Sequence, residues 1–123
     1  MYLLMAIIND PNKVVYILEG FLRIGIEGAT IVDSIGMAHL VADRVPVFSR
    51  FAALGVSERY NRMIFVLIDD KEEVDGAIEV IEYVVGDLTQ PETGLVWVLP
   101  VERCIGLNKV YKDKKDKKKD KNK

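Results

Sequence analysis

Few side chains in this sequence are of the types that catalysis or metal binding needs. The chain has one histidine, His39, and one cysteine, Cys104, and they are far apart in the sequence. Ser49 and Ser57 have no evident general base beside them, and the carboxylates are spread at spacings typical of solvated helix faces. A lone histidine does not make a metal site. The sequence therefore predicts a protein that is not an enzyme, without catalytic residues or a metal site.

Basic side chains remain as candidates for binding a ligand or a partner. His39 and Arg103 could each contact an anion, although each also fits a solvated loop position or a surface ion pair. Positive charge is also concentrated in and beside the stretch "VPVFSRFAALGVSERYNR" (45–62), where aromatic residues are frequent. The arginines there are Arg44, Arg50, Arg59 and Arg62. Since Arg and aromatic residues are enriched at interfaces, this stretch is a candidate for docking onto a partner or meeting a phosphate-bearing ligand.

Counted as a helix, the same stretch carries its apolar side chains on one side. Pro46 can begin this short amphipathic helix and Gly55 can end it. Two interpretations stay open, because an apolar stripe either folds back onto the body as core or docks onto another protein. On the second interpretation the predicted partner-binding residues are Arg44, Phe48, Arg50, Phe51, Leu54 and Arg59.

Hydrophobic periodicity predicts the elements that position these residues. Continuous apolar runs bounded by turn residues indicate strands, and apolar residues at i, i+3, i+4 and i+7 indicate helices. The order β-α-β-β-α-β predicts an α+β, ferredoxin-like fold with an antiparallel four-stranded sheet and two helices on one face. The expected strands cover residues 2–8, 29–36, 62–68 and 95–101, and the expected helices cover residues 11–24 and about 72–86.

The first, third and fourth strands are apolar on both faces. In the first strand, Leu4 and Ala6 alternate with Leu3 and Met5, so neither set is polar. Two helices cover only one face of such a sheet, and the other would expose an apolar patch larger than monomers usually tolerate. This pattern predicts that the chain associates with copies of itself.

Length and charge divide the chain into two parts. Its 123 residues, 50% of them apolar, predict one domain at residues 1–108. Residues 109–123 contain nine lysines and three aspartates, which gives this segment a charge of +6. Because the net charge of the whole chain is −2, residues 1–108 carry a charge of −8. We expect this tail to be disordered, serving either as a solubilising segment or as a contact with an anionic membrane surface or acidic partner. No nucleic acid partner is expected.

The composition also predicts the location of the protein. It lacks a spanning apolar run and a secretory leader, and its single cysteine cannot form an internal disulfide. We therefore expect a cytoplasmic protein, with peripheral membrane association as a further option through the tail.

Three segments together with the element order resemble the PII signalling family and its PII-like relatives. The segments are "GATIVDSIGM" (28–37), "FVLIDD" (65–70) and "GLVWVLPVER" (94–103), and the resemblance covers roughly residues 1–107. It implies a homotrimer of ferredoxin-like subunits whose effector clefts lie between neighbours. It also implies that residues 37–61 form a T-loop-like insertion that engages a target, either a membrane transporter or an enzyme.

The resemblance further implies which residues line the effector cleft. Thr30, Gly36 and Gly94 match family positions, and His39 and Arg103 are the basic groups expected nearby. The implied effector is an adenine nucleotide (ATP, ADP or AMP) or another anion. This chain departs from the family where basic residues are usual, since Leu95, Gly106 and Asn108 stand there, and Ala38 and Leu40 replace groups used with 2-oxoglutarate. We do not predict 2-oxoglutarate sensing.

Two other interpretations stay open. One is a ligand-independent trimeric scaffold that binds a partner or a membrane surface through its loop and basic tail. The other is a CutA-like metal-tolerance protein, which shares the fold class but for which no ligand set is evident in the sequence.

Overall fold

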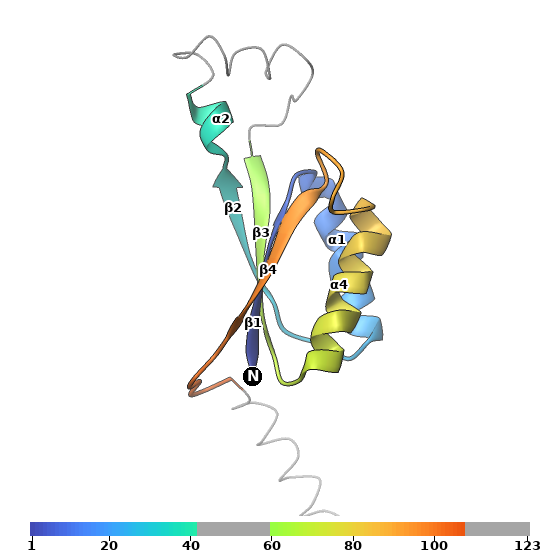
Figure 1. The fold of residues 1–123 in the computed structure, drawn as a ribbon, viewed down its shortest axis with the longest axis vertical. Helices are drawn as coiled ribbons and strands as arrows, with labels where there is room; N and C mark the ends of the chain where they lie inside the picture. Colours follow the sequence, from blue (N-terminus) through green and yellow to red (C-terminus); the bar gives the residue numbers. More distant parts are fainter. Residues whose placement is uncertain (42–59, 108–123) are drawn as a thin grey trace, which may run out of the picture.

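A computed structural model of this chain describes residues 1–41 and 60–107. The helix predicted near residues 46–55 and the tail from residue 108 onward lie outside the described residues. Within the described part, strands and helices alternate along the chain (Figure 1). The strands are β1 (Tyr2–Ile8), β2 (Thr30–Ile35), β3 (Tyr60–Ile68) and β4 (Gly94–Pro100), and the helices are η1 (Pro11–Lys13), α1 (Val14–Arg23), α2 (Met37–Leu40) and α4 (Lys71–Val85).

The first long helix has the start and stop signals that the sequence predicts, although residues 11–13 form a 3₁₀ turn and α1 itself covers Val14–Arg23. The Asp10 carboxylate accepts a hydrogen bond from the Asn12 N–H at 3.0 Å, and Pro11 opens the η1 turn that leads into α1. Gly25 follows α1 with a φ of +89°, and its N–H donates to the carbonyl of Leu22. Because glycine adopts this left-handed conformation without strain, the chain can turn back toward the sheet here.

Helix α4 is delimited in the same way. The Asp70 carboxylate accepts a hydrogen bond from the N–H of Glu73 at 2.9 Å, which caps the first turn. Glu72 and Glu73 lie in that first turn, where the helix dipole favours negative charge. Gly86, with a φ of +91°, terminates the helix. Both helices therefore start directly after a buried strand and fold back over it.

The four strands form one antiparallel sheet in the order β2-β3-β1-β4. Met5 of β1 lies opposite Phe65 of β3 on one side and Trp97 of β4 on the other, and Thr30 of β2 pairs with Phe65. The predicted α+β class with a four-stranded antiparallel sheet is confirmed, and the topology is compatible with a ferredoxin-like fold.

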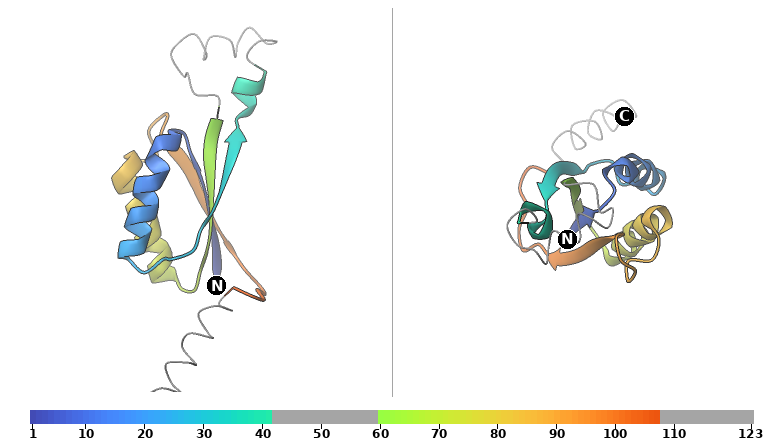
Figure 2. Two further views of the ribbon diagram at one scale, coloured as in Figure 1. Left: turned by 180° about the vertical axis from the view of Figure 1, so that it is seen from behind. Right: turned by 90° about the horizontal axis from the view of Figure 1, so that it is seen from above.

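Both long helices lie on the same face of the sheet, as Figure 1 and the view from behind in Figure 2 show. Alternate residues of the two central strands point into this layer and are fully buried, and they meet the apolar stripes of α1 and α4. The helices approach closely at Gly20, where an added Cβ would lie 2.5 Å from Cγ1 of Val80. The largest fully buried side chains are Phe21, Leu4, Ile8, Ile17, Ile64, Ile68, Ile81, Val14 and Val66.

Among the described residues, none of the helices lies over the opposite face of the sheet (Figures 1 and 2). We call it the open face and define it by the residues that alternate with the buried ones. Its side chains are half-buried or exposed, with Leu95 at 58%, Leu99 at 47% and Val32 at 43% exposure. The open face consists of Leu3, Met5, Ile7, Thr30, Val32, Ser34, Met63, Phe65, Leu67, Leu95, Trp97 and Leu99.

Some boundaries differ from the predicted ones. Strand β3 begins at Tyr60, two residues earlier than expected, because Tyr60 and Asn61 extend the ladder with the end of β2. The turn α2 forms directly after β2 within the stretch expected to be a loop. Among residues 1–41 and 60–107, none of the helices is long and apolar enough to cross a membrane.

Candidate functional site

The chain between β2 and β3 leaves and re-enters the sheet at one end, which we call the loop end. It is the end at which β1 and β2 finish and β3 and β4 begin. Figure 1 shows α2 and the loop before β4 at this end. Four chain segments from distant parts of the sequence meet there, so the loop end is the part of the described structure best placed to hold a site.

Gly36 and His39 lie together where β2 ends. The N–H groups of His39 and Leu40 both donate to the carbonyl of Gly36 at 3.1 Å, which closes the single turn of α2. A Cβ added to Gly36 would lie 3.7 Å from Nδ2 of Asn61 and 3.8 Å from Cδ2 of His39. The His39 ring is half-buried beside this glycine. Gly36 and the side chains of His39 and Asn61 thus lie close together at the end of β2.

Apolar side chains on α2 are exposed beside this cluster. Met37 is 70% exposed and Leu40 is 65% exposed, and Tyr60, opposite Ile35 at the start of β3, is 61% exposed. Such exposure over a single turn is typical of a segment that contacts something else, although isolated exposed apolar residues are common on proteins.

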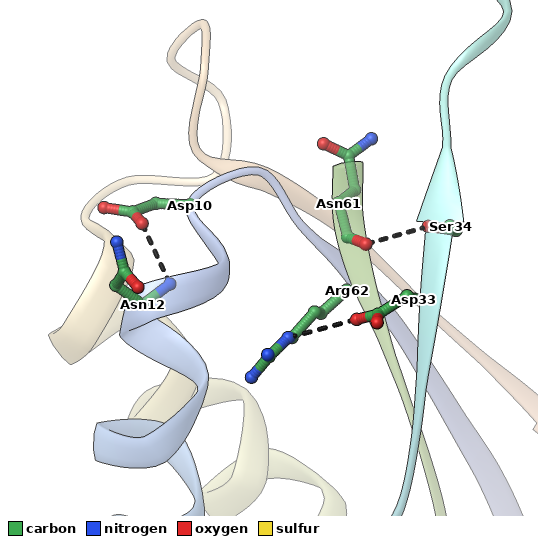
Figure 3. A network of polar contacts seen from close by, with 6 residues as sticks. All are labelled: Asp10, Asn12, Asp33, Ser34, Asn61 and Arg62. Carbon is green, nitrogen blue, oxygen red and sulfur yellow. Dashed lines mark hydrogen bonds and ion pairs between the residues drawn. The ribbon is translucent and has the colours of Figure 1, made fainter. Parts of the chain in front are cut away.

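Arg62 is not a free positive charge. Its Nε donates to Oδ1 of Asp33 at 3.2 Å across the β2–β3 ladder (Figure 3). Nearby, the Ser34 hydroxyl donates to the carbonyl of Asn61 at 3.4 Å. The sequence suggested Arg62 as a group that meets a phosphate, whereas the structure uses it to tie the two strands together. Asp33 and Asn61 were not predicted as polar contacts, because their proximity depends on the register of β2 against β3.

The loop before β4 is tied down by its own hydrogen bonds. The Asp87 carboxylate accepts a hydrogen bond from the Thr89 hydroxyl at 2.7 Å and another from the Thr89 N–H at 2.9 Å. Both bonds lower the pKa of Asp87, and the bond from the hydroxyl has the larger effect. The Thr93 hydroxyl donates to the carbonyl of Gln90 at 3.0 Å. The charged residues in this loop, Asp87 and Glu92, are both acidic. The loop therefore offers no cation of its own to a phosphate group.

Gly94 follows this loop at a point where the backbone of β4 crowds that of β1. An added Cβ would clash with the carbonyl oxygen of Ile7, and the φ of Gly94 is +157°. Gly94 is one of the residues expected to line the effector cleft. The close approach that the structure describes is to strand β1.

The five predicted ligand-binding residues do not meet within one chain. Gly36 and His39 lie at the β2 edge of the loop end, and Gly94 lies at the β4 edge of the same end. Two strands separate these edges, so they are about 14 Å apart at the usual strand spacing. Thr30, the first residue of β2, pairs with Phe65 in the middle of β3, and Arg103 follows β4 at the other end of the sheet. The predicted partner-binding residues, Arg44, Phe48, Arg50, Phe51, Leu54 and Arg59, lie outside the described residues.

The other features of the described structure point to no chemistry. A hollow of about 170 Å³ lies between α1 and the chain that precedes β2, lined by apolar side chains such as Leu18, Phe21 and Ile26, with Glu27 beside them. Cys104 is a free, half-buried thiol. Within residues 1–41 and 60–107 we find no group of three His, Cys, Asp or Glu side chains that could hold a metal ion.

Comparisons with known proteins add no relative to this description. No protein-family model matches the chain, and no curated protein matches its sequence.

Proposed function

We propose that this chain is a PII-like regulatory protein that works as a homotrimer. In this proposal it binds a small effector, an adenine nucleotide or another anion, in clefts between subunits. It then acts on a membrane transporter or an enzyme through residues 37–61, without catalysis of its own. The single observation that carries the proposal is the open face of the sheet.

The open face supports self-association on physical grounds. It presents apolar rows from three neighbouring strands, and its fringe residues Leu95 and Leu99 are about half exposed. Burying such surface contributes about 25 cal/mol per Å², and a patch of this kind on a soluble chain usually marks an interface. Three copies arranged around an axis with their open faces inward would bury the patch and leave the helices outside.

The scattered ligand residues support a cleft shared between subunits. Gly36 and His39 occupy one edge of the sheet and Gly94 the other, so a ligand that touched both groups would need the edges of two different subunits. The chain leaves the sheet at Gly36 and passes through α2 before residue 42. A ligand held there would change the population of loop arrangements by the difference in its affinity for them.

A second candidate function is a ligand-independent trimeric scaffold that binds a partner or an anionic membrane surface through residues 37–61 and the basic tail. The specific observation in its favour is the charge at the loop end. Asp87 and Glu92 make the loop before β4 acidic, and Arg62 is already paired with Asp33. Polyphosphate sites usually require free Lys or Arg groups.

Native mass spectrometry of the full chain, alone and with ATP, ADP or AMP, separates these functions. We expect a trimer that takes up to three copies of one nucleotide. His39→Ala should then weaken uptake, because His39 lies at the loop end beside Gly36, whereas the control Tyr83→Ala, on the exposed side of α4, should not change it.

Each other outcome is decisive. A trimer that takes up none of the three nucleotides would overturn the sensor and leave the scaffold. A monomer at micromolar concentration would overturn both, since each requires the open face to be covered. Tryptophan fluorescence gives a second measurement of assembly. The only tryptophan, Trp97, lies on the open face, so its emission should shift to the red when the subunits separate.

A further inference from the structure

The sheet ends in two edge strands that use only half of their backbone groups. Strand order places β2 at one edge and β4 at the other, and within the described residues each pairs with a single neighbour. The outer N–H and C=O groups of such strands are ready to pair with another strand.

The hydrogen bonds at the ends of β4 identify which groups face outward. The Val101 N–H donates to the Met1 carbonyl at 3.0 Å, and the Asn9 N–H donates to the Thr93 carbonyl at 3.4 Å. Backbone groups alternate sides along a strand, so the odd-numbered residues of β4 face β1. Gly94, Val96 and Val98 therefore direct their N–H and C=O groups outward. The same alternation, carried across the observed register, makes Ile31, Asp33 and Ile35 the outward residues of β2.

Neither edge carries the features that usually prevent pairing. Natural edge strands are protected by lysines, prolines, bulges or a very short length. Strand β4 has seven residues without a charge, and its one proline, Pro100, comes last. Strand β2 has six residues with one charge, Asp33, which Arg62 neutralises. The registers of both ladders are continuous, without a bulge.

We propose that β2 of one copy of this chain pairs with β4 of the next copy as antiparallel strands, so that the sheet continues from subunit to subunit around the ring. The proposal rests on the trimer proposed above and adds the joint between its subunits. Since the four strands alternate in direction, β2 and β4 run opposite ways, and a β4–β2 joint continues the antiparallel order.

The strand that pairs with each edge is best supplied by a second copy of this chain. The outward residues of β2 and β4 all have their side chains on the helix-covered side of the sheet, so pairing them leaves the open faces of both copies on one side. A head-to-tail joint can close into a ring that buries those faces. A joint between two β2 strands would instead leave both open faces and both β4 edges in water.

The lengths of the two strands select one register. The largest overlap sets all six residues of β2 against residues 94–99 of β4, with Pro100 outside the ladder. In this register Ile31, Asp33 and Ile35 exchange hydrogen bonds with Val98, Val96 and Gly94 of the next copy. Gly36 then lies beside the start of β4 of that copy, in place of the separation of about 14 Å within one chain.

A disulfide tests this register directly. In the joint, Ser34 lies opposite Leu95 of the next copy, and these two residues form a non-hydrogen-bonded pair. The Cα atoms of such a pair are about 4.5 Å apart, which is within the range that a disulfide spans. Ser34→Cys with Leu95→Cys, in a full chain that also carries Cys104→Ser, should oxidise to covalent dimers and trimers on a non-reducing gel. The matched control is Ser34→Cys with Leu99→Cys, whose positions in the joint are displaced by about 13 Å. Two strands separate Ser34 from Leu95 within one chain, so the expected bond can form only between copies.

The outcomes distinguish this inference from the function on which it rests. Cross-linking at least tenfold faster for the Ser34/Leu95 pair than for the Ser34/Leu99 pair would support the joint whether or not nucleotide binds. Equal rates for the two pairs in a protein that native mass spectrometry shows to be trimeric would overturn the joint and leave the trimer. A monomer would overturn both. Amide exchange of the unmodified protein is the second measurement, and rapid exchange at Ile31, Asp33, Val96 and Val98 in the trimer would also overturn the joint.

Discussion

The two faces of the sheet are built from similar residues but have different surroundings. On β1, Leu4 is fully buried beneath the helices, whereas Leu3, its neighbour in sequence, lies half-buried on the open face. Strand β3 repeats the contrast with Ile64 and Phe65. Residue type therefore does not decide burial in this chain. Burial depends on which face the two available helices cover.

The contrast shows how the fold and the proposed function are related. The helix-covered face has the close packing expected of a core, with Gly20 against Val80, and it can hold the single chain together. The open face contributes little to a single chain, because much of its apolar surface stays in water. In the proposed trimer its stabilising effect would depend on a partner, and the same sheet would serve as core on one side and as interface on the other.

The largest expected effect tests this contrast with two leucines. Leu4→Ala should lower the free energy of unfolding by about 2–5 kcal/mol, because it leaves a cavity in the helix-covered core. Leu3→Ala should lower it by only about 1 kcal/mol in the separated chain, since its side chain is half-buried. Urea unfolding at several protein concentrations measures both, and only Leu3→Ala should change the concentration dependence of the midpoint. Equal and concentration-independent losses would show that the two faces are not different in this way.

A second, smaller effect measures how tightly the helices pack. Gly→Ala inside a helix usually gains about 0.5–1 kcal/mol. Gly76→Ala should show this gain, because its nearest neighbour is the flexible end of Ile24 at 3.4 Å. Gly20→Ala should instead destabilise the protein by about 1–2 kcal/mol, because Val80 must move. Thermal unfolding of the two variants should show shifts of opposite sign, and a gain at both sites would mean that the layer is loosely packed.

The contrast between the faces could be predicted from the sequence because its signals are local. Alternation of apolar residues marked the strands, and Asp10, Gly25 and Gly86 marked where helices begin and end. Burial on one face followed from the count of helices against strands. These features depend on neighbours in sequence, whose geometry is fixed by the backbone.

The candidate site could not be predicted in the same way because it depends on relations between distant segments. Arg62 is paired because the β2–β3 register sets it opposite Asp33, and no local pattern in the sequence indicates that register. Gly36 and Gly94 lie on opposite edges because the strand order inserts β3 and β1 between them. The turn α2 was missed because one helical turn is too short to show a periodicity.

The smallest expected effect concerns the ion pair between Arg62 and Asp33. Both residues lie on the helix-covered side of the sheet, but their side chains are largely in water. Their side chains are 44% and 73% exposed, so the pair should behave as a surface ion pair and not as part of the core. Arg62→Gln should cost about 0.2–1 kcal/mol of unfolding free energy, and the loss should shrink in 1 M NaCl, where charges are screened within about 3 Å. A double-mutant cycle with Asp33→Asn isolates the coupling between the two side chains. A coupling above about 2 kcal/mol that resists salt would mean that the two side chains are removed from water, and the pair would then belong to the core and not to the surface.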